Sequence, residues 1–93
     1  MIEDKDILPY NFFAYKGIYT GAFENMRYRI WRTGEKPDFK LNVCAWAGPY
    51  AYPYVPDEDK ISSEFEASEE GRLAAIQWLN EQFAKREWEP KEY

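Results

Sequence analysis

The segment MRYRIWRTGEKPDFKLNVCAWA, residues 26–47, predicts the central hairpin of the fold. In residues 26–33, methionine, tyrosine and isoleucine alternate with arginine, arginine and tryptophan. Residues 39–47 repeat the alternation after a loop that contains Gly34 and Pro37. A period of two is typical of strands that bury one face and expose the other. We therefore predict two antiparallel strands with one face on a core and the other face open.

The exposed face of this hairpin combines positive charges with flat aromatic rings. It can bind an acidic segment of a protein, or stack nucleobases as the sheets of RNA-binding modules do. It can equally be saturated within the sheet by arginine–tryptophan stacking and by ion pairs to Glu64 and Glu66. The candidate binding residues on this face are Arg27, Arg29, Trp31, Lys40 and Trp46.

The chain before the hairpin predicts a first strand and its turn. Residues 12–19, FFAYKGIY, are rich in aromatic and β-branched side chains, and residues 20–25 follow as a turn with Gly21 available for a positive φ. Residues 1–10 are mostly charged and predict a flexible N-terminal arm. The length leaves room for one core, so we predict a single domain over residues 11–93.

Residues 48–56, GPYAYPYVP, form the most unusual segment of the chain. Its three prolines cannot donate hydrogen bonds to a sheet, which favours a rim or an edge over a central strand. The tyrosine rings can cover the end of the sheet while their hydroxyl groups stay in water. Covering is the favoured interpretation, but Tyr50, Tyr52 and Tyr54 are also candidate binding residues.

A strand and a helix complete the predicted fold. Residues 60–67 alternate again, and Ser68 can cap a helix that continues to Glu87. The sequence thus predicts an α+β fold, a four-stranded, mainly antiparallel sheet with one C-terminal helix packed on one face. The strand order is 1-2-3-4, or the fourth strand lies beside the first. The stripe that packs on the sheet is predicted to comprise Ile76, Leu79 and Phe83, with Leu73 at its edge.

Trp78 lies off the predicted stripe, on the side of the helix where a solvated residue is expected. Either residues 88–93 or the N-terminal arm cover it, or it contacts a partner. We therefore keep Trp78 as a candidate binding residue.

Composition excludes several functions. The net charge is −5, although residues 26–50 carry five basic groups against two acidic ones. This balance argues against general nucleic-acid binding, which relies on lysine and arginine. The chain has no histidine, no glycine-rich phosphate loop and no calcium-loop pattern, so we predict no catalytic, cofactor or metal site. The lone Cys44 and the absence of a signal-peptide pattern or a long apolar run favour a cytoplasmic protein away from membranes.

Three motifs carry a resemblance. They are YTGAFENMRYRIWR, then W-A-GPY within residues 46–50, and the helix segment QWLNEQF. The chain resembles a group of small bacterial proteins that share these motifs and have no established activity. Some of them carry an acetyltransferase label, which the residues here do not support. An acetyl-CoA site of that superfamily needs a glycine-rich loop before a helix, whereas residues 68–71 contain one glycine and two acids.

The leading hypothesis is a small non-enzymatic protein that binds a macromolecule. The favoured partner is another protein, or a second copy of the same chain in a homodimer. One alternative is an acidic inhibitor from a mobile element that imitates nucleic acid, which requires the acids of residues 57–70 and 81–92 on one exposed face. Another is a small enzyme that uses carboxylates or tyrosines beside residues 48–56. A carboxyl group with a raised pKa in an aromatic pocket would favour the enzyme.

Overall fold

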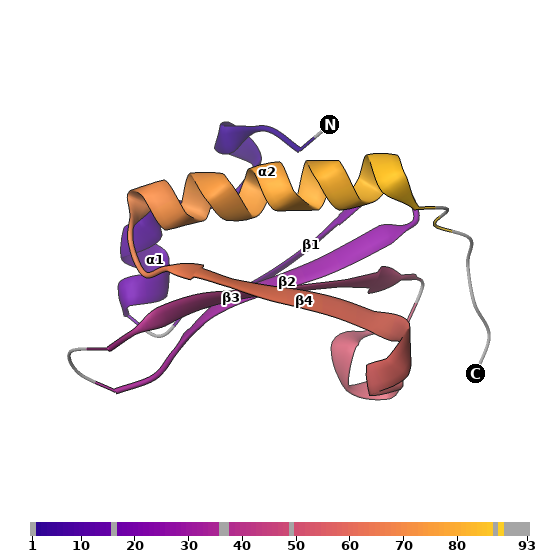
Figure 1. The fold of residues 1–93 in the computed structure, drawn as a ribbon, viewed down its shortest axis with the longest axis horizontal. Coiled ribbons are helices and arrows are strands. Elements are labelled where there is room, and N and C mark those ends of the chain that lie inside the picture. The colour runs from indigo at the N-terminus through magenta and orange to yellow at the C-terminus, as the bar shows by residue number, and fades with distance from the viewer. Residues whose placement is uncertain (1, 16, 36–37, 49, 87, 89–93) are drawn as a thin grey trace.

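The computed structural model describes residues 2–15, 17–35, 38–48, 50–86 and 88. Four antiparallel strands form one sheet in the order β1-β2-β3-β4, and the C-terminal helix α2 lies along one face of it (Figure 1). The predicted α+β class is confirmed, together with the first of the two strand orders. The elements are α1 (Tyr10–Ala14), β1 (Ile18–Phe23), β2 (Met26–Thr33), β3 (Lys40–Ala47), β4 (Lys60–Glu66) and α2 (Glu69–Lys85).

The β2–β3 hairpin is the one that the alternation predicts. Its strands pair antiparallel, with Met26 opposite Ala47 and Ile30 opposite Val43. Met26, Ile30 and Val43 have no exposed surface. Complete burial of one such side chain stabilises a fold by about 1.5–3 kcal/mol, so this face of the hairpin is the centre of the core.

Helix α2 begins where the sequence predicts. The Ser68 hydroxyl accepts a hydrogen bond from the Gly71 N–H at 3.1 Å, which satisfies one of the free donors of the first turn. A Cβ at Gly71 would lie 1.6 Å from the Glu66 carbonyl oxygen, so only glycine fits between the helix and the end of β4. The helix ends at Lys85, short of the predicted end at Glu87.

The buried stripe of α2 differs in one respect from the prediction. Leu73 is 44% exposed, whereas Arg72 is buried. The Arg72 guanidinium donates to the Glu69 carboxylate at 2.8 Å and to the Ile7 carbonyl oxygen at 3.3 Å, and these partners allow a charge to be buried. The buried residues of α2 are Gly71, Arg72, Ala75, Ile76 and Leu79.

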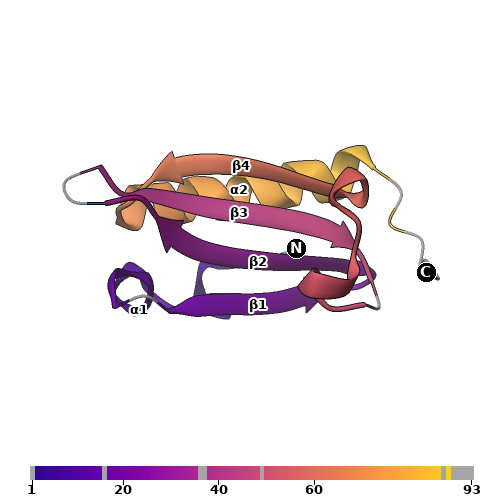
Figure 2. The ribbon, with the colours of Figure 1, turned by 90° about the horizontal axis from the view of Figure 1, so that it is seen from below.

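Trp78 packs against the sheet. It is half-buried, and its ring meets that of Phe65 on β4 with 6.4 Å between centroids. We predicted the C-terminal tail, the N-terminal arm or a partner as its neighbour. Because α2 lies over β3 and β4 (Figure 2), the flank of the helix toward β4 is covered as well. In the tail, Trp88 donates its indole N–H to the Phe83 carbonyl oxygen at 3.2 Å, and residues 89–93 lie outside the described part.

The first strand lies further along the chain than predicted. Residues 10–14 form the short helix α1, which buries Phe13 completely, and the predicted turn at 20–25 is mostly strand. The chain reverses at residues 24–25, where Glu24 has a φ of 53°. Gly21 is needed for packing rather than for a turn, because a Cβ there would lie 2.6 Å from the Tyr28 ring.

The described part of the N-terminal arm, residues 2–9, is packed where we predicted a flexible segment. Ile2 and Ile7 are buried in the main core. The Ile2 N–H donates to the Asn80 side-chain oxygen, and the Asn80 amide donates back to the Ile2 carbonyl oxygen, both at 2.9 Å. The arm therefore lies beside α2 and helps to close this face of the sheet (Figure 1).

Candidate interaction surface

The sheet face opposite α2, here called the open face, is covered only at one end by the described residues. Residues 50–59, here called the flap, turn back beneath it after β3 and contain two short 3-10 turns, Tyr52–Tyr54 and Asp57–Asp59 (Figure 2). The flap forms a second, smaller cluster with β3. Its buried members are Cys44, Trp46 and Val55.

Tyr52 is the centre of this cluster. Its ring meets those of Trp31 and Trp46 edge to face, with centroids 5.8 Å and 5.7 Å away. The Trp46 indole N–H donates to the Tyr50 carbonyl oxygen at 2.8 Å, which fastens the flap to β3. Trp46 therefore lies on the predicted face, but only 2% of it is exposed. The flap covers Trp46, and its side chain is not available for direct contact with a partner.

Two cations pack on the Tyr52 ring. The Arg29 guanidinium carbon lies 4.3 Å from the ring centroid and 4.7 Å from the Trp31 ring. The Lys60 ammonium lies 3.9 Å from the Tyr52 centroid and forms an ion pair with Asp57 at 3.5 Å. Such contacts each contribute about 0.5–1 kcal/mol at exposed sites, so rings and charges hold the flap together with the buried Val55.

The arginines of the open face have no hydrogen-bond or ion-pair partner among the described residues. Arg27 and Arg29 are both half-buried, and the Arg29 Nε is buried without an acceptor in that part of the chain. The predicted arginine–tryptophan stacking is present. The predicted ion pairs to Glu64 and Glu66 are not formed by either arginine in the described residues. The charge of this face is therefore not neutralised within the sheet.

Among the described residues, a hollow lies on each side of Tyr52 on the open face. The first has a volume of about 270 Å³ and is lined by Arg27, Trp46 and the β1 residues Thr20 and Ala22. The second has a volume of about 210 Å³. Its lining includes Trp31, Asn42, Cys44, Lys60 and Ser62. Both hollows are smaller than typical small-molecule pockets of about 300–1,000 Å³.

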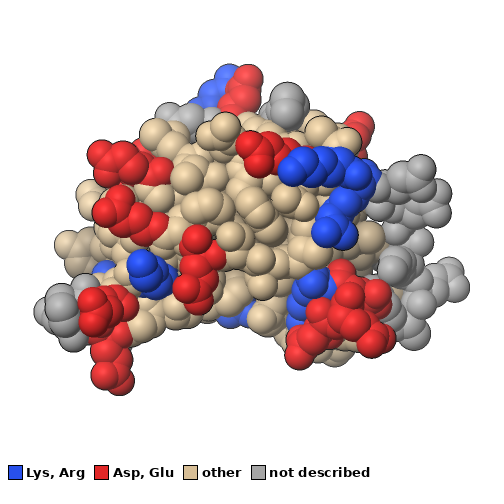
Figure 3. Space-filling model, viewed as in Figure 1, with Lys and Arg blue, Asp and Glu red and all other residues tan. Residues whose placement is uncertain are grey.

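Acidic side chains border this surface. In Figure 3 the lower outline is hollowed between two groups of acids, one at the β2–β3 loop and one at the flap. Glu35 and Asp38 belong to the loop, and Asp57 and Glu58 belong to the flap. The basic and aromatic centre is thus flanked by negative charge at both ends.

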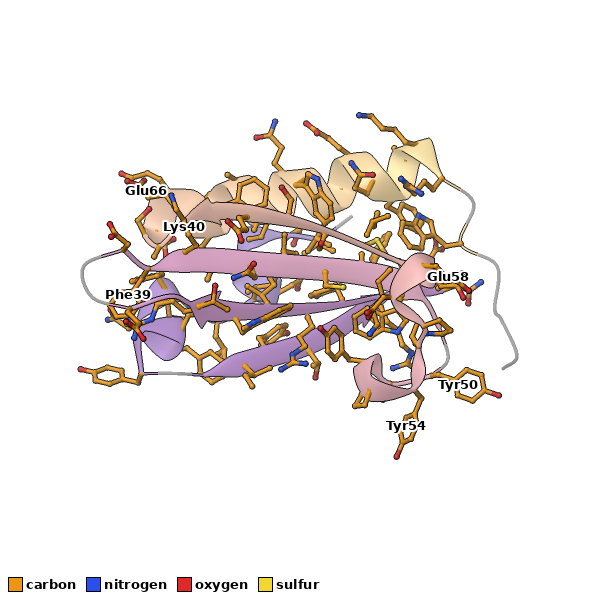
Figure 4. All side chains as sticks on the ribbon, turned by 60° about the horizontal axis from the view of Figure 1, so that its bottom comes forward. Phe39, Lys40, Tyr50, Tyr54, Glu58 and Glu66 are labelled. Atoms are coloured by element: carbon orange, nitrogen blue, oxygen red, sulfur yellow. The ribbon has the colours of Figure 1, made fainter. Side chains whose placement is uncertain are left out.

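The predicted binding residues divide into two groups. The structure brings Arg27, Arg29, Trp31, Trp46 and Tyr52 together at one end of the open face. Figure 4 shows Tyr50 and Tyr54 at the outer side of the flap, with Tyr54 73% exposed, and Lys40 at the other end of the sheet beside Glu66. Trp78 lies on the other side of the sheet. Lys60 was not predicted, because only the fold-back of the flap brings it to Tyr52.

The Cys44 thiol of the cluster favours its uncharged, unreactive form. Burial raises the pKa of the Cys44 thiol, although the nearby charges of Lys60 and Arg29 act in the opposite direction. A thiol is a weak nucleophile compared with a thiolate, so Cys44 is suited to packing. On the other face, burial and the neighbouring Tyr19 raise the pKa of Tyr28 to about 12. The hydrogen bond from Arg72 lowers the pKa of Glu69.

No group of three or more histidine, cysteine, aspartate or glutamate residues in the described part of the chain is arranged to hold a metal ion. None of the described helices is long and apolar enough to cross a membrane.

The chain matches no protein-family model, no curated protein and no solved structure. The resemblance to small bacterial proteins therefore stays a prediction. Fold and surface chemistry alone support a functional proposal.

Proposed function

We propose that this is a non-enzymatic, cytoplasmic protein-binding domain whose open face receives a short acidic segment of another protein. The observation that carries the proposal is the pair Arg27 and Arg29, half-buried beside aromatic rings and without a carboxylate partner among the described residues. A guanidinium group binds a carboxylate through two parallel hydrogen bonds, and the surrounding rings lower the competition from water.

The bordering acids favour a short ligand over a long polyanion. A nucleic acid that crossed the open face would also pass Glu35 and Asp38 at one end and Asp57 at the other, and these charges repel phosphates. A segment with a few carboxylates can stay over β2, between the two acidic groups and away from the exposed Glu64 on β4. An aromatic side chain in that segment could stack on the exposed part of Trp31.

The two alternative functions receive less support. The described acids of residues 57–70 lie on different sides of the molecule, since Asp57 and Glu58 are on the flap whereas Glu69 and Glu70 begin α2 (Figure 1). This scatter does not suit a mimic of nucleic acid. The small enzyme is less favoured because the hollows beside Tyr52, of about 270 and 210 Å³, are smaller than typical small-molecule pockets.

Calorimetric titration with defined peptides tests the proposal. The probes are a peptide of alternating glutamate and glycine with one central phenylalanine, its glutamine counterpart, and an oligouridylate. We expect only the acidic peptide to bind, and the Arg27→Gln/Arg29→Gln variant to bind at least about tenfold more weakly. Lys85→Gln/Arg86→Gln is the matched control, because it removes the same charge from the exposed end of α2. Equal loss in both variants, or no binding of the acidic peptide at about 1 mM, would contradict the proposal.

A further inference from the structure

The two edges of the sheet differ in how they are protected. β4 carries Lys60, Glu64 and Glu66, and charged side chains are a common protection against strand pairing. The other edge strand, β1, has the sequence IYTGAF, which contains neither a charge nor a proline. An uncharged edge strand is a template for pairing with another strand.

The outward backbone groups of β1 can be assigned from its hairpin. Phe23 pairs with Met26 across the two-residue turn, and the residues that flank such a turn exchange both of their hydrogen bonds. The bonding alternates from there, so Ile18, Thr20 and Ala22 direct their N–H and C=O groups away from β2. Among the described residues, no backbone hydrogen bond outside the β1–β2 pairing uses these groups.

Exposed apolar side chains gather along the chain that leads into β1. Leu8 is 44% exposed, Tyr15 is 87% exposed and Ile18 is 53% exposed. Among the described residues, only Tyr54 and Leu73 are further large hydrophobic side chains of comparable exposure. Figure 2 shows α1 at the start of β1, at the outer edge of the sheet. The edge with unpaired backbone groups is therefore also the edge with uncovered apolar surface.

We propose that β1 pairs antiparallel with β1 of a second copy of this chain, about a two-fold axis at Thr20. An axis that places two like edges antiparallel must be perpendicular to the sheet, so residues on the same face meet. Thr20 then lies opposite Thr20 of the second copy, and Ile18 lies opposite Ala22 of the second copy. All three outward-directed residues exchange backbone hydrogen bonds in this register, which no shifted register achieves.

The side chains fit the same register. Thr20 is exposed on the open face, and threonine pairs across strands are favourable. On the helix-side face, Tyr19 lies beside Gly21 of the second copy, where no side chain stands in its way. Two chains with a net charge of −5 repel each other, and a contact along an uncharged strand keeps this repulsion low.

This arrangement selects a second copy over a strand of another protein. The strand is complementary to itself in length, hydrogen bonding and side-chain size, and the symmetric contact closes after two copies. Both open faces lie on the same side, so the dimer presents the two arginine pairs on one continuous surface. Neither Arg27 nor Arg29 takes part in the pairing, although Thr20 and Ala22 also line the first hollow of the open face.

Sedimentation equilibrium of the full chain tests the pairing. An interface made by a single six-residue strand pair is small and therefore weak. The protein concentration should extend to about 500 µM. We expect a dimer, and at least about a tenfold higher dissociation constant for Thr20→Lys, which places two positive charges opposite each other on the axis. Ser62→Lys is the matched control, since Ser62 is exposed on the same face of the opposite edge strand β4. A monomer, or a dimer that Thr20→Lys leaves unchanged, would overturn the proposal.

A cross-link checks the register without adding charge. Opposed Cα atoms in a hydrogen-bonded antiparallel pair are about 5.5 Å apart, within the range that a disulfide spans. In a Cys44→Ala background, which removes the native thiol paired with Ser62, Thr20→Cys should give a covalent dimer under mild oxidation, whereas Ser62→Cys should remain uncross-linked. Circular dichroism of both variants verifies the fold. Equal cross-linking of the two variants, or none in Thr20→Cys, would overturn pairing at this edge.

Discussion

The two faces of the sheet are closed by different kinds of contact. On the helix-side face, α2, α1 and the arm bury aliphatic and aromatic side chains, among them Phe13 and Leu79, with no exposed surface. On the open face, the flap covers one end through Tyr52, which packs on two indole rings and two cations. The first face has the composition of a core, whereas the second has that of a recognition surface. Stability and binding should therefore respond separately to changes on the two faces.

The largest effect is expected on the helix-side face. Leu79 is fully buried at the centre of α2, so Leu79→Ala should lower the free energy of unfolding by about 2–5 kcal/mol through lost burial and a cavity. Urea denaturation measures this change. Leu73→Ala is the control, because Leu73 on the same helix is 44% exposed and should cost much less. Similar losses for both variants would mean that α2 does not pack as described.

The alkaline limb of stability should depend on Tyr28. Its pKa is raised from 10.0 to about 12 in the folded state, so the unfolded chain loses this proton first. Stability is therefore fully present below pH 10 and falls as the pH rises from 10 toward 12, by up to about 2 kcal/mol. Tyr28→Phe should flatten the fall in urea denaturation across this range. If the variant leaves the slope unchanged, groups other than Tyr28 cause the fall in stability.

The flap should respond more weakly. Tyr52→Ala removes the ring on which Trp31, Trp46, Arg29 and Lys60 converge, and we expect a loss of about 1–2 kcal/mol. Trp46 would become solvated, so the tryptophan emission should shift to longer wavelength. Tyr52→Phe retains the ring and should keep the wild-type emission. If Tyr52→Ala leaves the spectrum unchanged, the flap does not depend on this residue.

The hairpin and the open face could be predicted from the sequence, because alternation over residues 26–33 and 40–47 fixes which side chains share a face. The arm could not. Ile2 and Ile7 are single apolar residues among charges, and the hydrogen bonds of Ile2 reach Asn80 at the far end of the chain. Local patterns do not record such contacts.

The site was predicted in part for the same reason. Strand alternation places Arg27, Arg29 and Trp31 on the open face, and Tyr52 was expected to cover the end of the sheet. The burial of Trp46 and the arrival of Lys60 depend on how the flap turns back, which its prolines restrict but do not determine.

The smallest effect on stability is expected at Arg27. It has no hydrogen-bond or ion-pair partner among the described residues, so Arg27→Gln should change the free energy of unfolding by less than about 0.5 kcal/mol. Arg72→Gln provides the contrast, since that buried guanidinium bonds Glu69 and the Ile7 carbonyl oxygen and its loss should cost about 1–3 kcal/mol. If the two variants lose equal stability in thermal and urea unfolding, Arg27 is a structural residue.

The most direct test of the open face as the binding surface is an NMR titration of the labelled protein with the acidic peptide. The account predicts that the amide shifts are confined to the flap and to the ends of β2 and β3 beneath it, around Arg27, Arg29 and Tyr52. Residues of α2 and the arm should stay unchanged. Shifts that centre on α2, or an absence of shifts at saturating peptide, would contradict it.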